Sequence, residues 1–303
     1  MILEKRGYVL MTAARNEQAF LRYPIESVLS QTILPERWVI VSDGSTDRTD
    51  EIISDYASKY DFIQAVRRDR KEDNLRFASK VLALREAYDR VRGMSYQYIG
   101  NLDADVSFES DYYEKIISRL EANSQLGIAG GFIFECKRGR FKSRRSNSVR
   151  SVAGAIQMFR RECYEQMGGL TPIRVGGEDW IGETMARMHG WEVKAYRDCR
   201  VFHHKSSPKT RGWWREKFRL GLMDYAVGSH PLFEVMKCVR RLKESPLFLG
   251  AFYRFGGFVY GYCKQEVRPV SDEFVKYLRK EQLTRLRCRR MLTAGRCDSH
   301  CDL

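Results

Sequence analysis

The sequence lacks the long hydrophobic runs of membrane-spanning proteins and the internal repeats of solenoid proteins. Its most aromatic stretch, 246–263, has Arg254 in the middle. This stretch is too short and too charged to be a typical transmembrane helix. Residues 1–6 lead directly into a strand-like segment, so we expect no signal peptide. The eight cysteines form no close pairs until the last residues, so we expect free thiols in a reducing, cytoplasmic compartment.

The chain does carry a strong excess of positive charge. Its 303 residues include 53 Lys and Arg against 39 Asp and Glu, a formal net charge of +14. This balance favours polyanionic partners, which are nucleic acid, an anionic membrane surface or phosphorylated substrates. With 43% hydrophobic residues, the chain can form one large domain or one domain with an appendage.

Strand-like and helix-like segments alternate over the first hundred residues. Apolar runs predict buried strands at 8–13, 38–41, 63–66 and 96–102. Helical periodicity between these runs predicts a helix after each of the first three strands. The alternation predicts an α/β fold with a mostly parallel central sheet, helices on both faces and right-handed crossovers.

The pattern loosens after residue 105. Residues 137–145 are expected to form a very basic loop. We expect one domain over 1–205 and a helical C-terminal region over 206–303, where the composition becomes aromatic and basic. Within that region, 246–263 fits a membrane-interfacial segment or a core helix of a small subdomain equally well.

Carboxylates follow three of the predicted strands, at Glu17, Asp43 and the pair Asp103/Asp105. The carboxyl ends of parallel strands meet at one edge of a sheet, so these side chains should lie close together. Alternate residues of an extended chain share a face, so Asp103 and Asp105 can point into one cleft with Ala104 turned away. Two such oxygen donors suit a divalent cation that also binds substrate phosphates. An aspartate-rich turn capping the next helix is the alternative.

Four motifs resemble those of family 2 glycosyltransferases with the GT-A fold, in order and in spacing. They are T-A-A-R-N-E at 12–17, V-S-D-G-S-T-D-R-T at 41–49, D-A-D at 103–105 and G-E-D-W at 177–180. Each is weak alone, but the set is specific, and the resemblance covers roughly 7–205. It implies a GT-A catalytic domain with a nucleotide-sugar-binding half, 1–105, and an acceptor-side half, 106–205.

The resemblance also implies a donor site. Glu17 and Asp43 would hold the base and ribose of a sugar nucleotide, and Asp103 would assist through the ribose or the metal. The remaining residues expected at this donor site are Thr12, Ala13, Arg15 and Ala104.

A metal ion and a catalytic base are implied in the same way. Asp105, with Asp103, would bind Mg²⁺ or Mn²⁺ bridging the diphosphate. His203 or His204 would add a third ligand or a phosphate contact, although both also fit an ordinary polar strand end. Asp179 would be the base of an inverting transfer. Glu178 and Trp180 would contact the acceptor or support the base.

Two departures from the family pattern matter. Ser42 stands where the family often has a first aspartate, which weakens base recognition slightly. The Q-x-x-R-W motif of processive synthases is absent, although residues 213–215 lie in about the right region. We therefore expect a single-addition hexosyl- or N-acetylhexosaminyl-transferase in cell-surface polysaccharide or glycolipid assembly. It would use a sugar or lipid-linked acceptor and associate peripherally with the inner face of the cell membrane.

Two other classes compete with this interpretation. A nucleic-acid- or polyanion-binding protein would need a basic, aromatic face or a known module, and the acidic strand ends disfavour it, so we expect no nucleic-acid partner. A nucleotidyltransferase of the same fold would need a glycine-rich, basic loop after the first strand. Residues 14–17 form no such loop.

Overall fold

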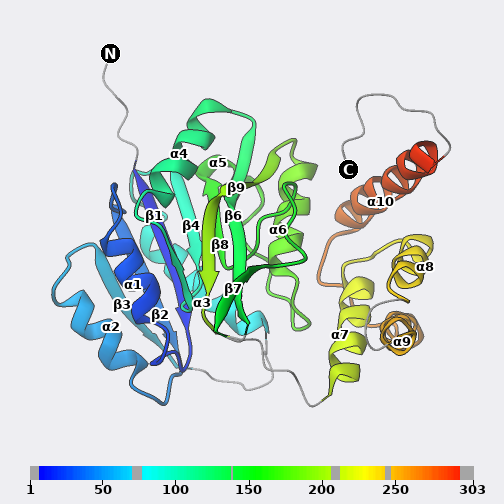
Figure 1. Cartoon of the computed structure of the whole chain (residues 1–303), viewed down its shortest axis with the longest axis horizontal. Coiled ribbons are helices and arrows are strands. Elements are labelled where there is room, and N and C mark those ends of the chain that lie inside the picture. The colour runs from blue at the N-terminus through cyan, green and yellow to red at the C-terminus, as the bar shows by residue number, and fades with distance from the viewer. Residues whose placement is uncertain (1–6, 70–76, 138, 206–211, 243–246, 294–303) are drawn as a thin grey trace. The chain divides into compact units, whose positions relative to one another are not determined.

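The computed structural model describes residues 7–69, 77–137, 139–205, 212–242 and 247–293 (Figure 1). The chain divides into two compact units, Met1–Ser207 and Pro208–Leu303. The first unit contains a mixed sheet, and the second contains helices only among its described residues.

Among the described residues of the first unit, nine strands form one sheet with the order β3-β2-β1-β4-β8-β6-β9-β5, and β7 pairs with β6. The first four strands run parallel to one another, as the strand–helix alternation predicts. Their bounds are β1 Tyr8–Ala14, β2 Arg37–Asp43, β3 Ile63–Arg68 and β4 Tyr98–Leu102.

The later strands make the sheet mixed, because β8 lies antiparallel between β4 and β6. Strand β9 then pairs parallel with β6 and antiparallel with β5. These strands are β5 Val106–Phe108, β6 Leu126–Lys137, β7 Arg140–Ser143, β8 Ile156–Arg160 and β9 Glu192–His203.

The expectation of a loop over 137–145 is wrong for the middle of this segment. Residues 140–143 form β7, which pairs antiparallel with the end of β6. Gly139 has φ +74°, a conformation that favours glycine and permits the tight turn between these strands. The sequence pattern does not predict this hairpin, because all four β7 residues are exposed and show no alternation of apolar and polar side chains.

Helices cover both faces of the sheet, and the two cores follow from the alternation of strand side chains. Leu10 and Ile40 point to one core, together with Ile25 of α1 and Ile116 of α4. Met11 and its neighbours on the other face meet α3, α5 and α6. The helices are α1 Arg22–Leu29, α2 Thr49–Ala57, α3 Phe77–Val91, α4 Tyr112–Ala122, α5 Arg161–Gln166 and α6 Glu178–Met188.

The second unit consists of α7 Trp213–Ala226, α8 Pro231–Arg240, α9 Leu249–Lys264 and α10 Asp272–Thr293. Helices α7 and α9 approach closely through glycines. A Cβ on Gly257 would lie 2.0 Å from the Phe218 carbonyl oxygen, and one on Gly221 would meet the backbone of Arg254. No helix in the described part of the chain has the length and apolar character needed to cross a membrane.

Arg254, in the middle of the aromatic stretch, is buried inside this helical unit. Its Nε donates to Glu234 Oε1 at 3.1 Å, and its guanidinium also pairs with Asp224. Lys237 Nζ completes the network at 2.6 Å from Asp224. One side of α9 is therefore a core face, as one of the two alternatives for 246–263 expects, while Phe252 on the same helix is 72% exposed.

Alanine substitutions at two adjacent glycines of α9 test the close packing of α9 against α7. Gly257→Ala should lower the free energy of unfolding by about 1–3 kcal/mol, because the new Cβ overlaps backbone atoms of α7. Gly256→Ala is the matched control, since a Cβ there meets no atom within 4 Å and removes a glycine from a helix. Urea unfolding of the full chain measures both, and equal effects would contradict the packing.

Candidate active site

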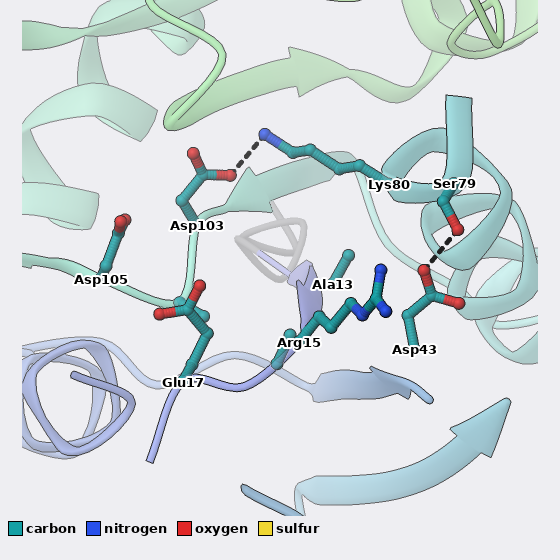
Figure 2. A pocket seen from close by; sticks show the side chains of 10 residues that line it. Ala13, Arg15, Glu17, Asp43, Ser79, Lys80, Asp103 and Asp105 are labelled. Carbon is teal, nitrogen blue, oxygen red and sulfur yellow. Dashed lines mark hydrogen bonds and ion pairs between the residues drawn. The ribbon is translucent and has the colours of Figure 1, made fainter. Parts of the chain in front are cut away.

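The carboxyl ends of β1, β2 and β4 and the start of α3 enclose a pocket of about 360 Å³. Figure 2 shows Glu17, Asp103 and Asp105 on one side of this pocket and Asp43 with Ser79 on the other. The full lining is Ala13, Ala14, Arg15, Glu17, Asp43, Ser79, Lys80, Asp103, Ala104 and Asp105.

Of the residues expected at the donor site, Thr12 lies outside this lining. Its side chain is fully buried, and its Oγ1 accepts a hydrogen bond from Trp38 Nε1 at 2.9 Å. Thr12 therefore joins β1 to β2 from within the sheet. Ala104 is 4% exposed and belongs to the core, so it anchors the turn between Asp103 and Asp105.

Asp43 is buried and held from two sides. Ser79 Oγ donates to its Oδ2 at 2.5 Å, and Arg68 NH1 donates to its Oδ1 at 2.5 Å. Gly44 follows with φ +65° and turns the chain away from β2. The carboxylate therefore has a fixed orientation at the pocket wall.

The polar residues after Gly44 support the neighbouring loop that carries Glu17. Asn16 Oδ1 accepts a hydrogen bond from the Thr46 N–H at 2.8 Å, and Glu17 N–H donates to Thr49 Oγ1 at 2.8 Å. Asn16 has φ +53°, which the side-chain bonds around it stabilise. The D-G-S-T-D-R-T motif is thus partly a scaffold for the first acidic loop.

Glu17 pairs with a cation from the C-terminal end of the first unit's sequence. Lys205 Nζ lies 2.5 Å from its Oε1, whereas its buried Oε2 has no hydrogen-bond partner. Burial raises the pKa of Glu17, the Lys205 contact lowers it, and the nearby Asp103 raises it further.

Asp103 and Asp105 differ in their surroundings. Asp103 Oδ1 pairs with Lys80 Nζ at 2.5 Å. Asp105 Oδ1 is buried without a hydrogen-bond partner, 3.4 Å from His203 Nε2. Burial first, and then the Asp103 charge, raise the pKa of Asp105 to about 6. An unpartnered carboxylate oxygen crowded by other carboxylates fits a divalent cation that takes its remaining ligands from phosphates and water.

The two histidines lie in different environments. His203 is the one beside Asp105. The His204 ring stacks on Tyr23 at 3.8 Å, and its Nε2 shares a 2.7 Å hydrogen bond with Ser107 Oγ. Burial lowers the pKa of His204. Among the residues that the structure describes, no cluster of three or more His, Cys, Asp or Glu could hold a metal ion.

A second pocket of about 220 Å³ shares Lys80 and Asp103 with the first. It contains Asp179, which lies in the first turn of α6 after Gly177 at φ +99°. Asp179 Oδ1 accepts the Trp180 N–H at 2.8 Å, and Oδ2 accepts the Gly154 N–H at 3.1 Å. The Trp180 side chain is not part of this lining, which is Lys80, Asp103, Ile133, Glu135, Arg144, Gly154, Ala155, Glu178, Asp179 and His203.

Lys80 connects the two pockets electrostatically. Burial acts to lower its pKa, but Asp103, Glu178 and Asp179 together outweigh burial and raise it. Burial raises the pKa of Glu178, and Lys80 opposes this shift. Sequence reasoning missed Lys80 and its neighbour Ser79, because nothing in the local pattern separates them from other helix residues.

The sequence pattern of Glycosyl transferase family 2 matches residues 10–180, more than half of the chain, and the chain belongs to this family. The poly-beta-1,6-N-acetyl-D-glucosamine synthase of Staphylococcus epidermidis is 24% identical over 247 residues, which cover 74% of this chain and 55% of that protein. The chain thus spans about half the length of this relative.

Solved structures show the same fold at low identity. The mannosyltransferase PcManGT of Pyrobaculum calidifontis, in complex with GDP-Man and Mn²⁺, has a TM-score of 0.55 and 16% identity, and the match covers 95% of this chain and 83% of that one. Staphylococcus aureus TarS 1–349 in complex with UDP-GlcNAc has a TM-score of 0.56 and 12% identity, with coverage of 96% and 88%. These matches confirm the predicted GT-A-like fold.

The raised pKa of Asp105 predicts a cost to stability that depends on pH. The folded protein holds this proton up to about pH 6, whereas an unfolded aspartate releases it near 4. The free energy of unfolding therefore falls as pH rises from about 4 to 6, and the loss is complete above this window. Without metal, Asp105→Asn should be more stable than wild type by about 1–3 kcal/mol at pH 8, with no advantage at pH 4.

Urea unfolding in EDTA at both pH values measures this difference. Asp198→Asn serves as the control, because that carboxylate is 55% exposed. If Asp105→Asn is only as stable as wild type at pH 8, or less stable, the claim that burial and neighbouring carboxylates destabilise the ionised Asp105 is contradicted.

Proposed function

We propose that the protein transfers a hexosyl or N-acetylhexosaminyl group from a nucleotide-diphosphate donor to an acceptor hydroxyl, with inversion and one sugar at a time. The observation that carries the proposal is the shared wall of the two pockets, formed by Lys80 and Asp103. One pocket presents the acidic strand ends, and the other presents Asp179. A donor in the first pocket would have its anomeric carbon near this wall and the acceptor beyond it.

The donor side would use the fixed carboxylates. Asp43, oriented by Ser79 and Arg68, suits the N–H groups of a base, and Glu17 suits a base or ribose hydroxyl. Asp105 would hold Mg²⁺ or Mn²⁺ through its unpartnered oxygen together with the donor diphosphate, and Asp103 and His203 would stand beside the ion. The bound ion would neutralise charge developing on the leaving diphosphate.

Proton transfer would fall to Asp179. The N–H groups of Trp180 and Gly154 orient its carboxylate at the start of α6. Asp179 would take the proton from the acceptor hydroxyl as the oxygen attacks the anomeric carbon from the face opposite the diphosphate. Glu178 lines the same pocket and would contact the acceptor.

The relatives support a substrate class. UDP-GlcNAc in TarS and the name of the staphylococcal synthase favour an N-acetylhexosamine donor and an acceptor in surface polysaccharide or glycolipid assembly. The missing Q-x-x-R-W motif favours single addition. We assign catalysis to 1–205 and peripheral contact with the inner face of the cell membrane, where a lipid-linked acceptor lies, to the helical region 206–303.

Asp179→Asn should lower the rate of sugar transfer by about 100- to 10,000-fold, because the amide cannot accept the acceptor proton. Affinity for UDP-GlcNAc with Mn²⁺ should stay within about twofold of wild type, since Asp179 lies in the second pocket. Transfer to a lipid-linked or oligosaccharide acceptor is followed by mass spectrometry, and donor binding by calorimetry.

Asp198→Asn, on an exposed carboxylate, should transfer at the wild-type rate. Undiminished transfer by Asp179→Asn would overturn the base assignment. The wild-type product should be one sugar heavier than the acceptor, and a ladder of longer products would overturn single addition.

A further inference from the structure

Helix α8 exposes an apolar stripe. Leu232, Val235, Met236 and Val239 are between 38% and 52% exposed. They recur at i, i+3, i+4 and i+7, so they share one helix face. The buried residues of this helix are Glu234 and Cys238. A stripe of this spacing ordinarily faces a core, so its exposure indicates a site that binds an apolar partner.

A second apolar element lies at the C-terminal end of α8. Residues 247–249, here called the aromatic turn, are each at least 52% exposed. The Phe248 N–H donates to the Leu242 carbonyl at 3.0 Å, and the Phe252 N–H donates to the Phe248 carbonyl, which fixes this turn beside the helix end. Phe248 has φ +59°, a conformation that L side chains rarely adopt. The fold thus holds a strained phenylalanine in an exposed position, as is common at functional sites.

Basic side chains border the stripe. A pocket of about 250 Å³ is lined by Phe233, Met236, Lys237, Arg240, Arg241 and Leu286, from α8, its C-terminal end and α10. Apolar and cationic groups therefore line one hollow. A phosphate headgroup with its acyl chains presents the matching combination of charge and apolar surface.

Acidic residues are few in the same region of the sequence, with only Glu234 and Glu244 between residues 231 and 264. The one acid of α8, Glu234, is fully buried and paired with Arg254. Residues 247–264 contain no Asp or Glu. The charge of this surface is therefore complementary to an anionic partner. Its exposed apolar side chains require that this partner also present apolar surface.

We propose that the α8 stripe and the aromatic turn, with Phe252, dock on the surface of an anionic lipid bilayer. Helix α8 lies in the interface plane, with its stripe at the boundary of the acyl chains and Phe248 at headgroup depth. Arg240 and Arg241 bind lipid phosphates. This inference names the contact surface for the membrane association in the proposed function, and it rests on that function for its biological setting.

Vesicle binding by the full-length chain tests the proposal. Wild type should sediment with vesicles of phosphatidylcholine and phosphatidylglycerol, and much less with phosphatidylcholine alone. Val239→Glu, at a side chain that is 51% exposed, should lower partition into the mixed vesicles by about tenfold, because a charge then enters the apolar boundary. Leu34→Glu, in the first unit and 50% exposed, is the matched control and should bind like wild type.

A second pair of variants tests the lipid phosphates. Arg240→Glu reverses a charge in the last turn of α8 and should weaken binding to the anionic vesicles by about fivefold or more. Arg90→Glu makes the same change in the last turn of α3 and should have little effect. Circular dichroism and thermal melting of every variant check that the fold is intact.

Three results would overturn the proposal. They are wild-type protein that binds neither vesicle, Val239→Glu that binds as well as Leu34→Glu, and a wild-type dimer in light scattering that Val239→Glu abolishes. Calorimetry with UDP-GlcNAc on the same wild-type sample separates the two claims. Donor binding without vesicle binding would overturn the docking surface alone, and vesicle binding without donor binding would overturn the donor assignment alone.

Discussion

The first unit, Met1–Ser207, depends on the neutralisation of carboxylates gathered at one edge of its sheet. Parallel strands bring Glu17, Asp43, Asp103 and Asp105 to this edge, and α6 adds acids in the adjoining pocket. Burial, with a smaller contribution from neighbouring carboxylates, raises the pKa of Glu17, Asp105 and Glu178. The fold supplies a fixed cation to several of them, and leaves Asp105 Oδ1 without a hydrogen-bond partner.

The fixed cations come from three separate parts of the chain. Arg68 ends β3, Lys80 lies near the start of α3, and Lys205 follows β9. Each therefore reaches its carboxylate only after the sheet and helices have packed. Lys80 has the further property of lining both pockets, so its ion pair with Asp103 borders the two pockets alike.

The sequence predicts the acids better than it predicts their partners. Asp103 and Asp105 end a conspicuous apolar run, so their position at a strand end follows from local pattern alone. Lys80 and Lys205 look like ordinary surface cations, because their role depends on contacts between residues distant in the chain. The same limit applies to β7, whose charged residues show no strand alternation, and to His203 and His204, which only the packing of Tyr23 and Ser107 distinguishes.

The central claim is that the unpartnered oxygen of Asp105 completes a metal-dependent donor site. Calorimetric titration of UDP-GlcNAc into wild type and Asp105→Ala, each with and without Mn²⁺, tests it most directly. Wild type should bind about 10- to 100-fold more tightly with Mn²⁺, and Asp105→Ala should lose this increment. Equal wild-type affinity with and without the metal, or a full increment retained by Asp105→Ala, would contradict the account.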